Sequence, residues 1–339
     1  MRVDFLYLSQ EDVIQCGALD MAQTIKCVED ATVMLYQKNA LEADAVHLLW
    51  NGISGKRMAV HAAYLGKGVD VAGGKIIASN PDNPLKSGIP RASAVLTLND
   101  PETGYPISMM EGALISHMRT GAMTGVGVKY LVGHGSPVIG LIGAGPISRT
   151  SLMALKEVLD EIGQVKIFDL VDRRAAAFEE ELEKDLCLDI RVVKSAEEAV
   201  RGSDIVVPAT TVGPGEAYIE YDWLKPGCVL SDASIWDEKD DVIVKADRVV
   251  INNVQRLHFR YDRFAPLIAE NRISRDAIVH LGAVITGQAK GRERDDDIIL
   301  FCPRGMCLYD VYNGFRIYQT ARAKGLGQVL TLWKEPIWS

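Results

Sequence analysis

The chain has 339 residues, of which 48% are hydrophobic and 24% charged, and its formal net charge is −8. This length predicts two domains with a sizeable core, and the acidic charge argues against binding to a nucleic-acid backbone. No apolar tract approaches the roughly 18 residues of a membrane span. The N-terminal residues also lack the basic region followed by an apolar region that is typical of a signal peptide. The six cysteines are spread thinly, as is typical of reduced thiols. We therefore expect a soluble cytoplasmic protein.

The first part of the chain predicts an α+β domain over residues 1–120. Ser9 and Asp12 have the spacing of a helix cap, and residues 21–37 show the apolar spacing of a helix. Between residues 45 and 97, short β-rich runs alternate with turn sequences such as NPDNPLKSGIP. This pattern predicts a mostly antiparallel sheet built from hairpins. After another turn, residues 107–132 predict a strand followed by a long helix rich in small residues, and we expect the domain boundary in or just after that helix.

From residue 137 strands and helices alternate, which is typical of a parallel, doubly wound α/β sheet. We expect this second domain to cover residues 121–313. The predicted strands lie at 137–145, 164–171, 189–195, 204–210, 227–234 and 246–253, and the predicted helices at 146–162, 175–186 and 195–203. The segment after Gly314 is helical again and is expected, as residues 314–339, to pack back on the first domain. Its last residues, Trp333 to Trp338, are expected to form a loose tail.

A glycine-rich turn follows the apolar strand PVIGLI and opens a helix. Gly143 permits the tight turn, and Gly145 lets the backbone approach a pyrophosphate at the helix N-terminus, where Pro146 and Ile147 follow. Ser148 stands where a third glycine is usual, so the helix and the strand are expected to lie slightly farther apart. A structural glycine turn is the alternative, but the strand before it and the helix after it favour a dinucleotide site.

Asp169 ends the second predicted strand of this unit. A carboxylate there accepts hydrogen bonds from both hydroxyls of the adenosine ribose, which favours NAD over NADP. Arg173 and Arg174 follow closely and keep NADP as an alternative. The predicted cofactor is NAD.

Three polar residues lie in segments that are otherwise apolar. Lys75 lies in VAGGKIIAS, where it either faces outward from a strand or is a desolvated amine tuned for general-base chemistry. Arg119 lies in a small-residue helix, where its guanidinium binds a carboxylate or forms a structural salt bridge. Asp237 follows the strand LSDASIW near the end of the sheet where substrates bind, although a loop aspartate is more often a cap. Spacing alone does not join these three into one site.

We predict no metal site. The histidines at 61, 117, 134, 258 and 280 do not have the spacing of metal ligands, and Cys302 and Cys307 form a C-x4-C pair without a second pair nearby.

These residues carry a resemblance to the ornithine cyclodeaminase/μ-crystallin family along nearly the whole chain. The matching blocks are GGKIIASNPDNP, residues 91–131 with LNDPETGYP and RTGA, GLIGAGPIS, SDASIWD, and residues 291–311. The resemblance implies a Rossmann domain plus a sheet domain that binds substrate and pairs with a second copy, so we expect a homodimer. It also implies that Lys75 orients substrate and activates water, Arg119 clamps a carboxylate and Asp237 acts as acid and base. Thr120 and Thr210 are expected to contact the cofactor.

Within the family, YIEYDWL and P-x-GM resemble the branch that cleaves N-(2-amino-2-carboxyethyl)-L-glutamate to 2-oxoglutarate and 2,3-diaminopropionate, a siderophore precursor. The resemblance therefore implies an NAD-dependent dehydrogenase acting on an amino acid. Cyclodeaminases, ketimine reductases or alanine dehydrogenase-like enzymes, and a crystallin-like binding protein are the alternatives. One feature departs from the family: the arginine usual early in the sheet domain is missing from ADAVHLLW, where His47 is the expected substrate contact instead.

Overall fold

The structure is a computed structural model that describes residues 1–50, 56–133, 135–254, 257 and 263–338. The chain divides into two compact units, residues Met1–Arg119 with Gly305–Ser339, and residues Thr120–Arg304. The segment that returns to unit 1 thus starts at Gly305 and not at Gly314. The reason is that helix α11, which packs on the sheet of unit 1, already begins at Cys307. His134 and His258 lie outside the described residues.

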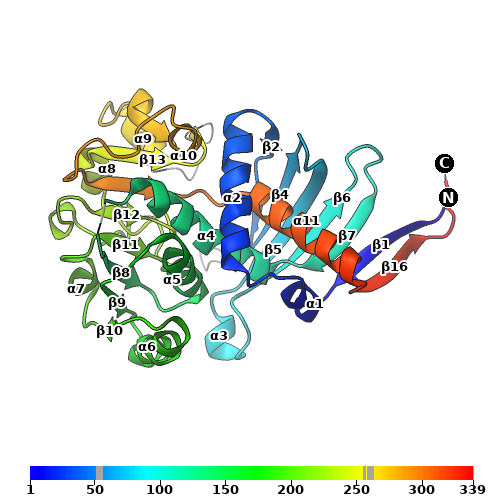
Figure 1. Cartoon of the computed structure of the whole chain (residues 1–339), viewed down its shortest axis with the longest axis horizontal. Coiled ribbons are helices and arrows are strands. Elements are labelled where there is room, and N and C mark those ends of the chain that lie inside the picture. The colour runs from blue at the N-terminus through cyan, green and yellow to red at the C-terminus, as the bar shows by residue number, and fades with distance from the viewer. Residues whose placement is uncertain (51–55, 134, 255–256, 258–262, 339) are drawn as a thin grey trace. The chain divides into compact units, whose positions relative to one another are not determined.

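Unit 1 is a mostly antiparallel sheet with helices on one face, as the sequence predicts (Figure 1). Its strands run in the order β16-β1-β7-β6-β5-β4-β2, and β3 also pairs with β4. The strands are β1 (Val3–Leu8), β2 (Ala40–Glu42), β3 (Val46–Leu49), β4 (Arg57–Leu65), β5 (Val71–Ser79), β6 (Ala92–Asn99), β7 (Pro106–Glu111) and β16 (Gln328–Trp333). The helices are α1 (Gln10–Gln15), α2 (Met21–Tyr36), α3 (Asn83–Lys86) and α11 (Cys307–Lys324), while α4 (Ala113–Leu131) contributes to both units.

Local sequence signals explain these elements. Ser9 and Asp12 form the expected capping box at the start of α1, with reciprocal hydrogen bonds between side chain and backbone. In β6 the side chains alternate, so that Leu96 and Leu98 are buried under the helices while Val95 is exposed on the opposite face. Gly314 of α11 lets this helix approach closely, because a Cβ atom there would lie 2.4 Å from Leu96.

The expectation of a loose tail over Trp333 to Trp338 is wrong for Trp333, which is the last residue of a strand. Residues Gln328–Trp333 form β16, which pairs antiparallel with β1, for example Phe5 with Leu330. Backbone hydrogen bonds of the N-terminal strand thus hold this segment, which an aromatic-rich composition alone does not reveal.

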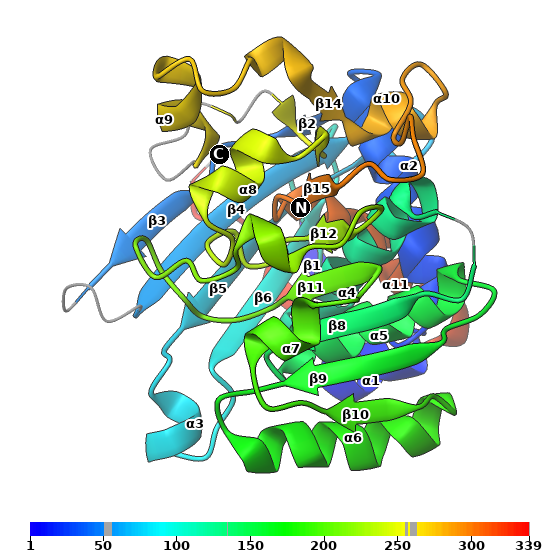
Figure 2. The same ribbon diagram turned by 90° about the vertical axis from the view of Figure 1, so that its left-hand side faces the viewer.

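Unit 2 is a parallel sheet in the order β10-β9-β8-β11-β12-β15-β13-β14, as predicted (Figure 2). Its strands are β8 (Val138–Ile142), β9 (Gln164–Phe168), β10 (Ile190–Val192), β11 (Ile205–Pro208), β12 (Val229–Ser231), β13 (Arg248–Ile251), β14 (Ile278–His280) and β15 (Ile299–Cys302). Its helices are α5 (Pro146–Val158), α6 (Asp172–Leu186), α7 (Ala196–Val200), α8 (Asp240–Lys245), α9 (Phe264–Ala269) and α10 (Leu281–Ile285), with 3₁₀ turns η1 (Tyr221–Trp223) and η3 (Arg275–Ala277).

Both faces of the parallel sheet are covered. One core cluster joins alternate strand residues such as Leu141 to Leu152 of α5 and Phe178 of α6. The other joins the intervening residues, such as Ile142, to α7, α8 and α9. This is the doubly wound arrangement, and it brings the carboxyl ends of the strands to one edge, where such folds bind ligands. In the described residues no helix has the length and apolarity needed to cross a membrane.

Candidate functional site

Unit 1 holds a buried cluster of charges around Asp310. Lys75 of β5 donates from Nζ to Asp310 Oδ2 at 2.8 Å and to Ser116 Oγ at 2.9 Å. Arg119 of α4 donates from Nε to Asp310 Oδ1 at 3.4 Å and from Nη2 to Ser116 Oγ at 3.2 Å. Lys75 is 2% exposed, Asp310 0% and Arg119 9%. The structure therefore brings two of the predicted site residues together, and it excludes an outward-facing Lys75.

Secondary structure explains how these side chains meet. Successive residues of a strand face opposite sides, so Lys75 lies on the helix-covered face of β5 and its neighbour Ile76, half exposed, on the other. Ser116 and Arg119 are three residues apart in α4 and therefore share one face of that helix. Asp310 lies in the first turn of α11, which packs against β4, β5 and β6.

The cluster carries two potential cations and one anion. Burial acts to raise the pKa of Asp310, but the charges of Arg119 and Lys75 outweigh it and hold this pKa below its ordinary value. Burial lowers the pKa of Lys75, an effect that Arg119 strengthens and Asp310 opposes. Asp310 is therefore ionised, and the excess positive charge favours an anionic ligand. Because burial lowers its pKa, Lys75 gives up its proton more readily than an exposed lysine.

His47, the third predicted substrate contact, lies on the exposed strand β3. Its ring makes an edge-to-face contact with His61 of β4, with 6.0 Å between the ring centroids. His61 pairs directly with Lys75 across the two strands.

In unit 2 the glycine-rich turn has the geometry expected of a phosphate-binding loop. Gly143 has a φ of +93°, and a Cβ atom there would lie 2.7 Å from the carbonyl oxygen of Ala209. Gly145 caps the N-terminus of α5, and a Cβ atom there would meet no described atom within 4 Å. Packing thus requires the glycine at 143, whereas the space beside Gly145 remains open in the way that a pyrophosphate needs. Pro146 and Ile147 form the first turn of α5.

Two side chains stabilise this loop. Asp169, directly after β9, accepts hydrogen bonds from the backbone N–H groups of Ala144 and Val171, both at 2.8 Å. Ser148, in place of a third glycine, is fully buried and its hydroxyl donates to the carbonyl oxygen of Gly143. Ser148 therefore stabilises the glycine-rich turn through this hydrogen bond. Arg173 and Arg174 are exposed in the first turn of α6.

Asp237 is completely buried in unit 2 and accepts three hydroxyl hydrogen bonds. Thr210 Oγ1 donates to it at 2.5 Å, Tyr218 OH at 2.8 Å, and Ser234 Oγ also donates. Burial and the nearby Asp232 raise the pKa of Asp237, while these hydroxyls act to lower it. The structure thus shows a hydrogen bond between Asp237 and Thr210, which is a predicted cofactor contact. The hydroxyls of Thr210 and Tyr218 are close enough to Asp237 to exchange a proton with it. Thr120, the first residue of unit 2, is half buried in α4.

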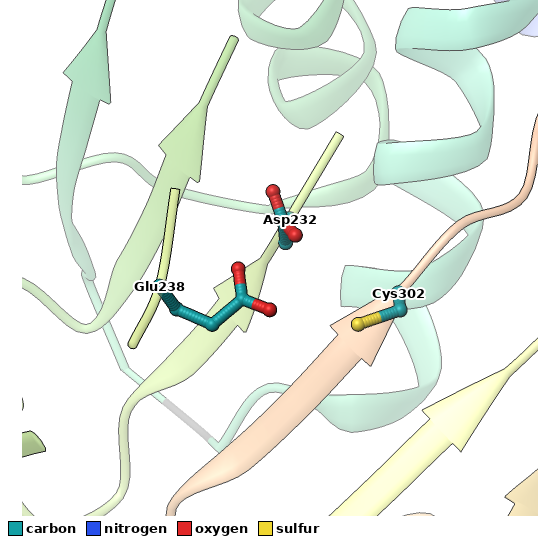
Figure 3. Close-up of side chains that lie close together, drawn as sticks. All are labelled: Asp232, Glu238 and Cys302. Atoms are coloured by element: carbon teal, nitrogen blue, oxygen red, sulfur yellow. The ribbon is translucent and has the colours of Figure 1, made fainter. Parts of the chain in front are cut away.

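Asp232, Glu238 and Cys302 form a second buried group at the carboxyl ends of β12 and β15 (Figure 3). Their ligand atoms lie within 4.8 Å of one another, which is close enough to consider a metal. However, Arg263 already places its guanidinium 3.0 Å from Glu238 Oε1. Burial and the charge of Asp232 raise the pKa of Glu238 well above its ordinary value, which favours the protonated carboxyl group beside Asp232.

Sequence reasoning missed Asp310, Ser116, Tyr218 and Ser234. Ser116 could have been found, because it precedes Arg119 by one helical turn. Asp310 is an acid within the apolar run MCLYDVYNGF, which is also a signal. Tyr218 reaches Asp237 only through tertiary packing.

Residues 11–325 match the model of the ornithine cyclodeaminase/mu-crystallin family. The chain belongs to this family. Over 338 residues the chain is 32% identical to N-((2S)-2-amino-2-carboxyethyl)-L-glutamate dehydrogenase of Staphylococcus aureus, an alignment that covers 98% of this chain and 100% of the relative.

Two solved structures have the same fold as this chain. Δ1-pyrroline-2-carboxylate reductase of Thermococcus litoralis, in complex with NADH and L-proline, superposes with a TM-score of 0.86 at 31% identity and covers 96% of this chain and 99% of its own. An archaeal alanine dehydrogenase dimer with bound NAD superposes with a TM-score of 0.85 at 28% identity, and the alignment covers 98% of this chain and 100% of that chain.

Proposed function

We propose that this protein is an NAD-dependent dehydrogenase that converts N-(2-amino-2-carboxyethyl)-L-glutamate to 2-oxoglutarate and L-2,3-diaminopropionate. The buried Lys75–Asp310–Arg119 cluster carries the proposal, because its excess positive charge suits an amino-acid carboxylate and its lysine suits proton transfer. The full-length similarity to the staphylococcal dehydrogenase supports this choice of substrate.

The glycine-rich turn of unit 2 supports NAD as the cofactor, because it leaves open space at Gly145. Asp169, which lies beside this turn, is the residue that we propose for the ribose hydroxyls. Bound NAD supplies a two-electron hydride acceptor for the carbon that carries the substrate amine. Thr120 and Thr210 are further contacts that we propose for the cofactor.

Arg119 is proposed to bind the α-carboxylate of the glutamate moiety and to orient the reacting carbon. Loss of hydride and of the amine proton leaves a carbon–nitrogen double bond. Lys75 positions the water that adds to this bond, after which the bond breaks and releases the oxo acid and the amine. Asp237 takes up the amine proton through Thr210 or Tyr218, because both hydroxyls donate to its Oδ1, while Ser234 donates to Oδ2.

The direct test follows NADH absorbance with NAD and either N-(2-amino-2-carboxyethyl)-L-glutamate or L-ornithine. We expect NADH and 2-oxoglutarate in equal amounts from the first compound. Proline and ammonia from ornithine, without net NADH, would identify a cyclodeaminase and contradict the proposal.

The second candidate is a reductase for cyclic imino acids, favoured by the 31% identity to the Thermococcus enzyme. Consumption of NADH with Δ1-pyrroline-2-carboxylate, together with no turnover of the glutamate adduct, would support this candidate instead.

Asp169→Ala is expected to weaken NAD binding by about 10–100-fold and to improve NADP relative to NAD, because a charged acceptor for the ribose hydroxyls is lost. The measurement is the Kd for each nucleotide by fluorescence titration. Asp172→Ala removes an exposed acid at the start of α6 and serves as the control. Unchanged NAD affinity in Asp169→Ala would show that this carboxylate only supports the loop.

We also propose a homodimer formed through the sheet of unit 1. Val46, Val60, Ile76 and Val95 lie side by side across four strands, and each is at least 40% exposed. A row of exposed aliphatic side chains is typical of an interface, and the archaeal alanine dehydrogenase is a dimer.

Val95→Lys is expected to raise the dimer dissociation constant by at least about 100-fold, because an unpaired charge is costly to bury. Sedimentation equilibrium measures this change. Leu170→Lys alters a 91% exposed residue of unit 2 and should leave the dimer intact. A Val95→Lys protein that remained a dimer would exclude this face as the interface.

A further inference from the structure

Lys75 is the first of a row of three side chains that lie on neighbouring strands of the unit 1 sheet, and the other two are His61 and His47. His61 of β4 lies directly opposite Lys75 of β5, and residues paired in this way face the same side of a sheet. His47 of β3 pairs with Ala59, also on that side, and its ring contacts the ring of His61. The row therefore leads from the buried ammonium of Lys75 to the exposed strand β3.

His61 has an unsatisfied polar atom. Its Nδ1 is buried and has no hydrogen-bond partner within the described part of the chain. A buried polar atom without a partner costs roughly 1–3 kcal/mol, so a group that bonds to it, such as a water molecule, an ion or a ligand, is favoured. The ring lies beside Lys75 of β5 and His47 of β3, and the charges of Arg119 on α4 and Asp310 on α11 also act on it. With two cations and one carboxylate among these groups, the surroundings favour an anion.

We propose that His61 binds a second carboxylate of the substrate, beyond the one that Arg119 holds, and thereby selects a dicarboxylic amino-acid moiety. This inference rests on the proposed function. His47, at the exposed end of the row, extends the same subsite.

The proposal has a consequence for protonation. Burial, followed by the charge of Lys75, lowers the pKa of His61 to about 4, so that the ring is neutral at pH 7 without ligand. A carboxylate beside the ring favours the imidazolium and raises this pKa. Binding of a dicarboxylate therefore takes up a proton between the two pKa values, and the affinity falls as the pH rises through the pKa of the complex.

The test compares His61→Gln with Arg57→Gln. Gln retains an N–H donor but does not titrate, and Arg57 is an exposed cation on the same face of β4. The substrates are the glutamate adduct and an analogue with L-2-aminobutyrate in place of glutamate. For His61→Gln we expect KM for the adduct to rise about 10-fold or more at pH 6, kcat to stay within a few-fold, and KM for the analogue to be unchanged. The pH dependence of KM should disappear.

Calorimetry of wild-type protein with NAD, in two buffers of different ionisation enthalpy, measures proton uptake on binding of 2-oxoglutarate or 2-oxobutyrate. We expect uptake only with 2-oxoglutarate and its loss in His61→Gln. Equal KM changes for both substrates, or loss of selectivity in Arg57→Gln instead, would overturn the proposal. If wild-type protein does not turn over the adduct, the proposed function is wrong. The calorimetric comparison still decides in that case whether His61 binds the second carboxylate.

Discussion

Lys75→Ala is expected to lower kcat by about 10²–10⁴-fold, the range for loss of a general acid–base group, while the Kd for NAD stays unchanged. The activity should fall because the amine Nζ of Lys75 is lost from the buried cluster in unit 1. NAD binding should persist because the glycine-rich turn belongs to unit 2. Single-turnover formation of NADH and nucleotide titration measure the two quantities.

A merely structural lysine would give a different pattern. The exposed Lys86→Ala is the matched control and should retain wild-type kcat. Addition of methylammonium should restore part of the activity of Lys75→Ala if the missing amine is chemically required. Near-wild-type kcat in Lys75→Ala would remove Lys75 from the mechanism, and a lower melting temperature with no amine rescue would assign it to folding.

Asp310→Asn is expected to reduce both stability and turnover. The carboxylate is fully buried between Lys75 and Arg119, and breaking a buried ion pair costs about 3–5 kcal/mol because the remaining charge has no counterion. Two cations would then face each other, and the pKa of Lys75 should fall further. Urea unfolding gives the free energy, and kcat gives the loss of activity.

The double variant Asp310→Asn with Lys75→Met separates the two effects. Removing one cation together with the anion should recover much of the stability but none of the activity. If the double variant were no more stable than Asp310→Asn, the charge balance would not explain the role of Asp310.

Local sequence patterns predicted much of the fold because they report local physics. Short β-rich runs between turn sequences, such as those that contain Lys75 and Leu96, predicted hairpin strands, and strand–helix alternation after residue 137 predicted the parallel sheet that the structure contains. Boundaries were less accurate: the return to unit 1 begins at Gly305, because the apolar face of α11 starts before the residues that show a helical pattern. The pairing of β16 with β1 joins opposite ends of the chain, so no local pattern contains it.

For the site, the sequence by itself determined which residue types were out of place: a lysine in a β-run, an arginine in an apolar helix and a glycine turn after a strand. Only the tertiary structure decided their partners. Asp310 meets Lys75 across 235 positions of the chain, and Tyr218 and Ser234 meet Asp237 through the folding of its own loop region. Ionisation follows from burial and from such distant neighbours, so the protonation states of Lys75, His61 and Asp237 belong to the folded protein and not to the sequence pattern.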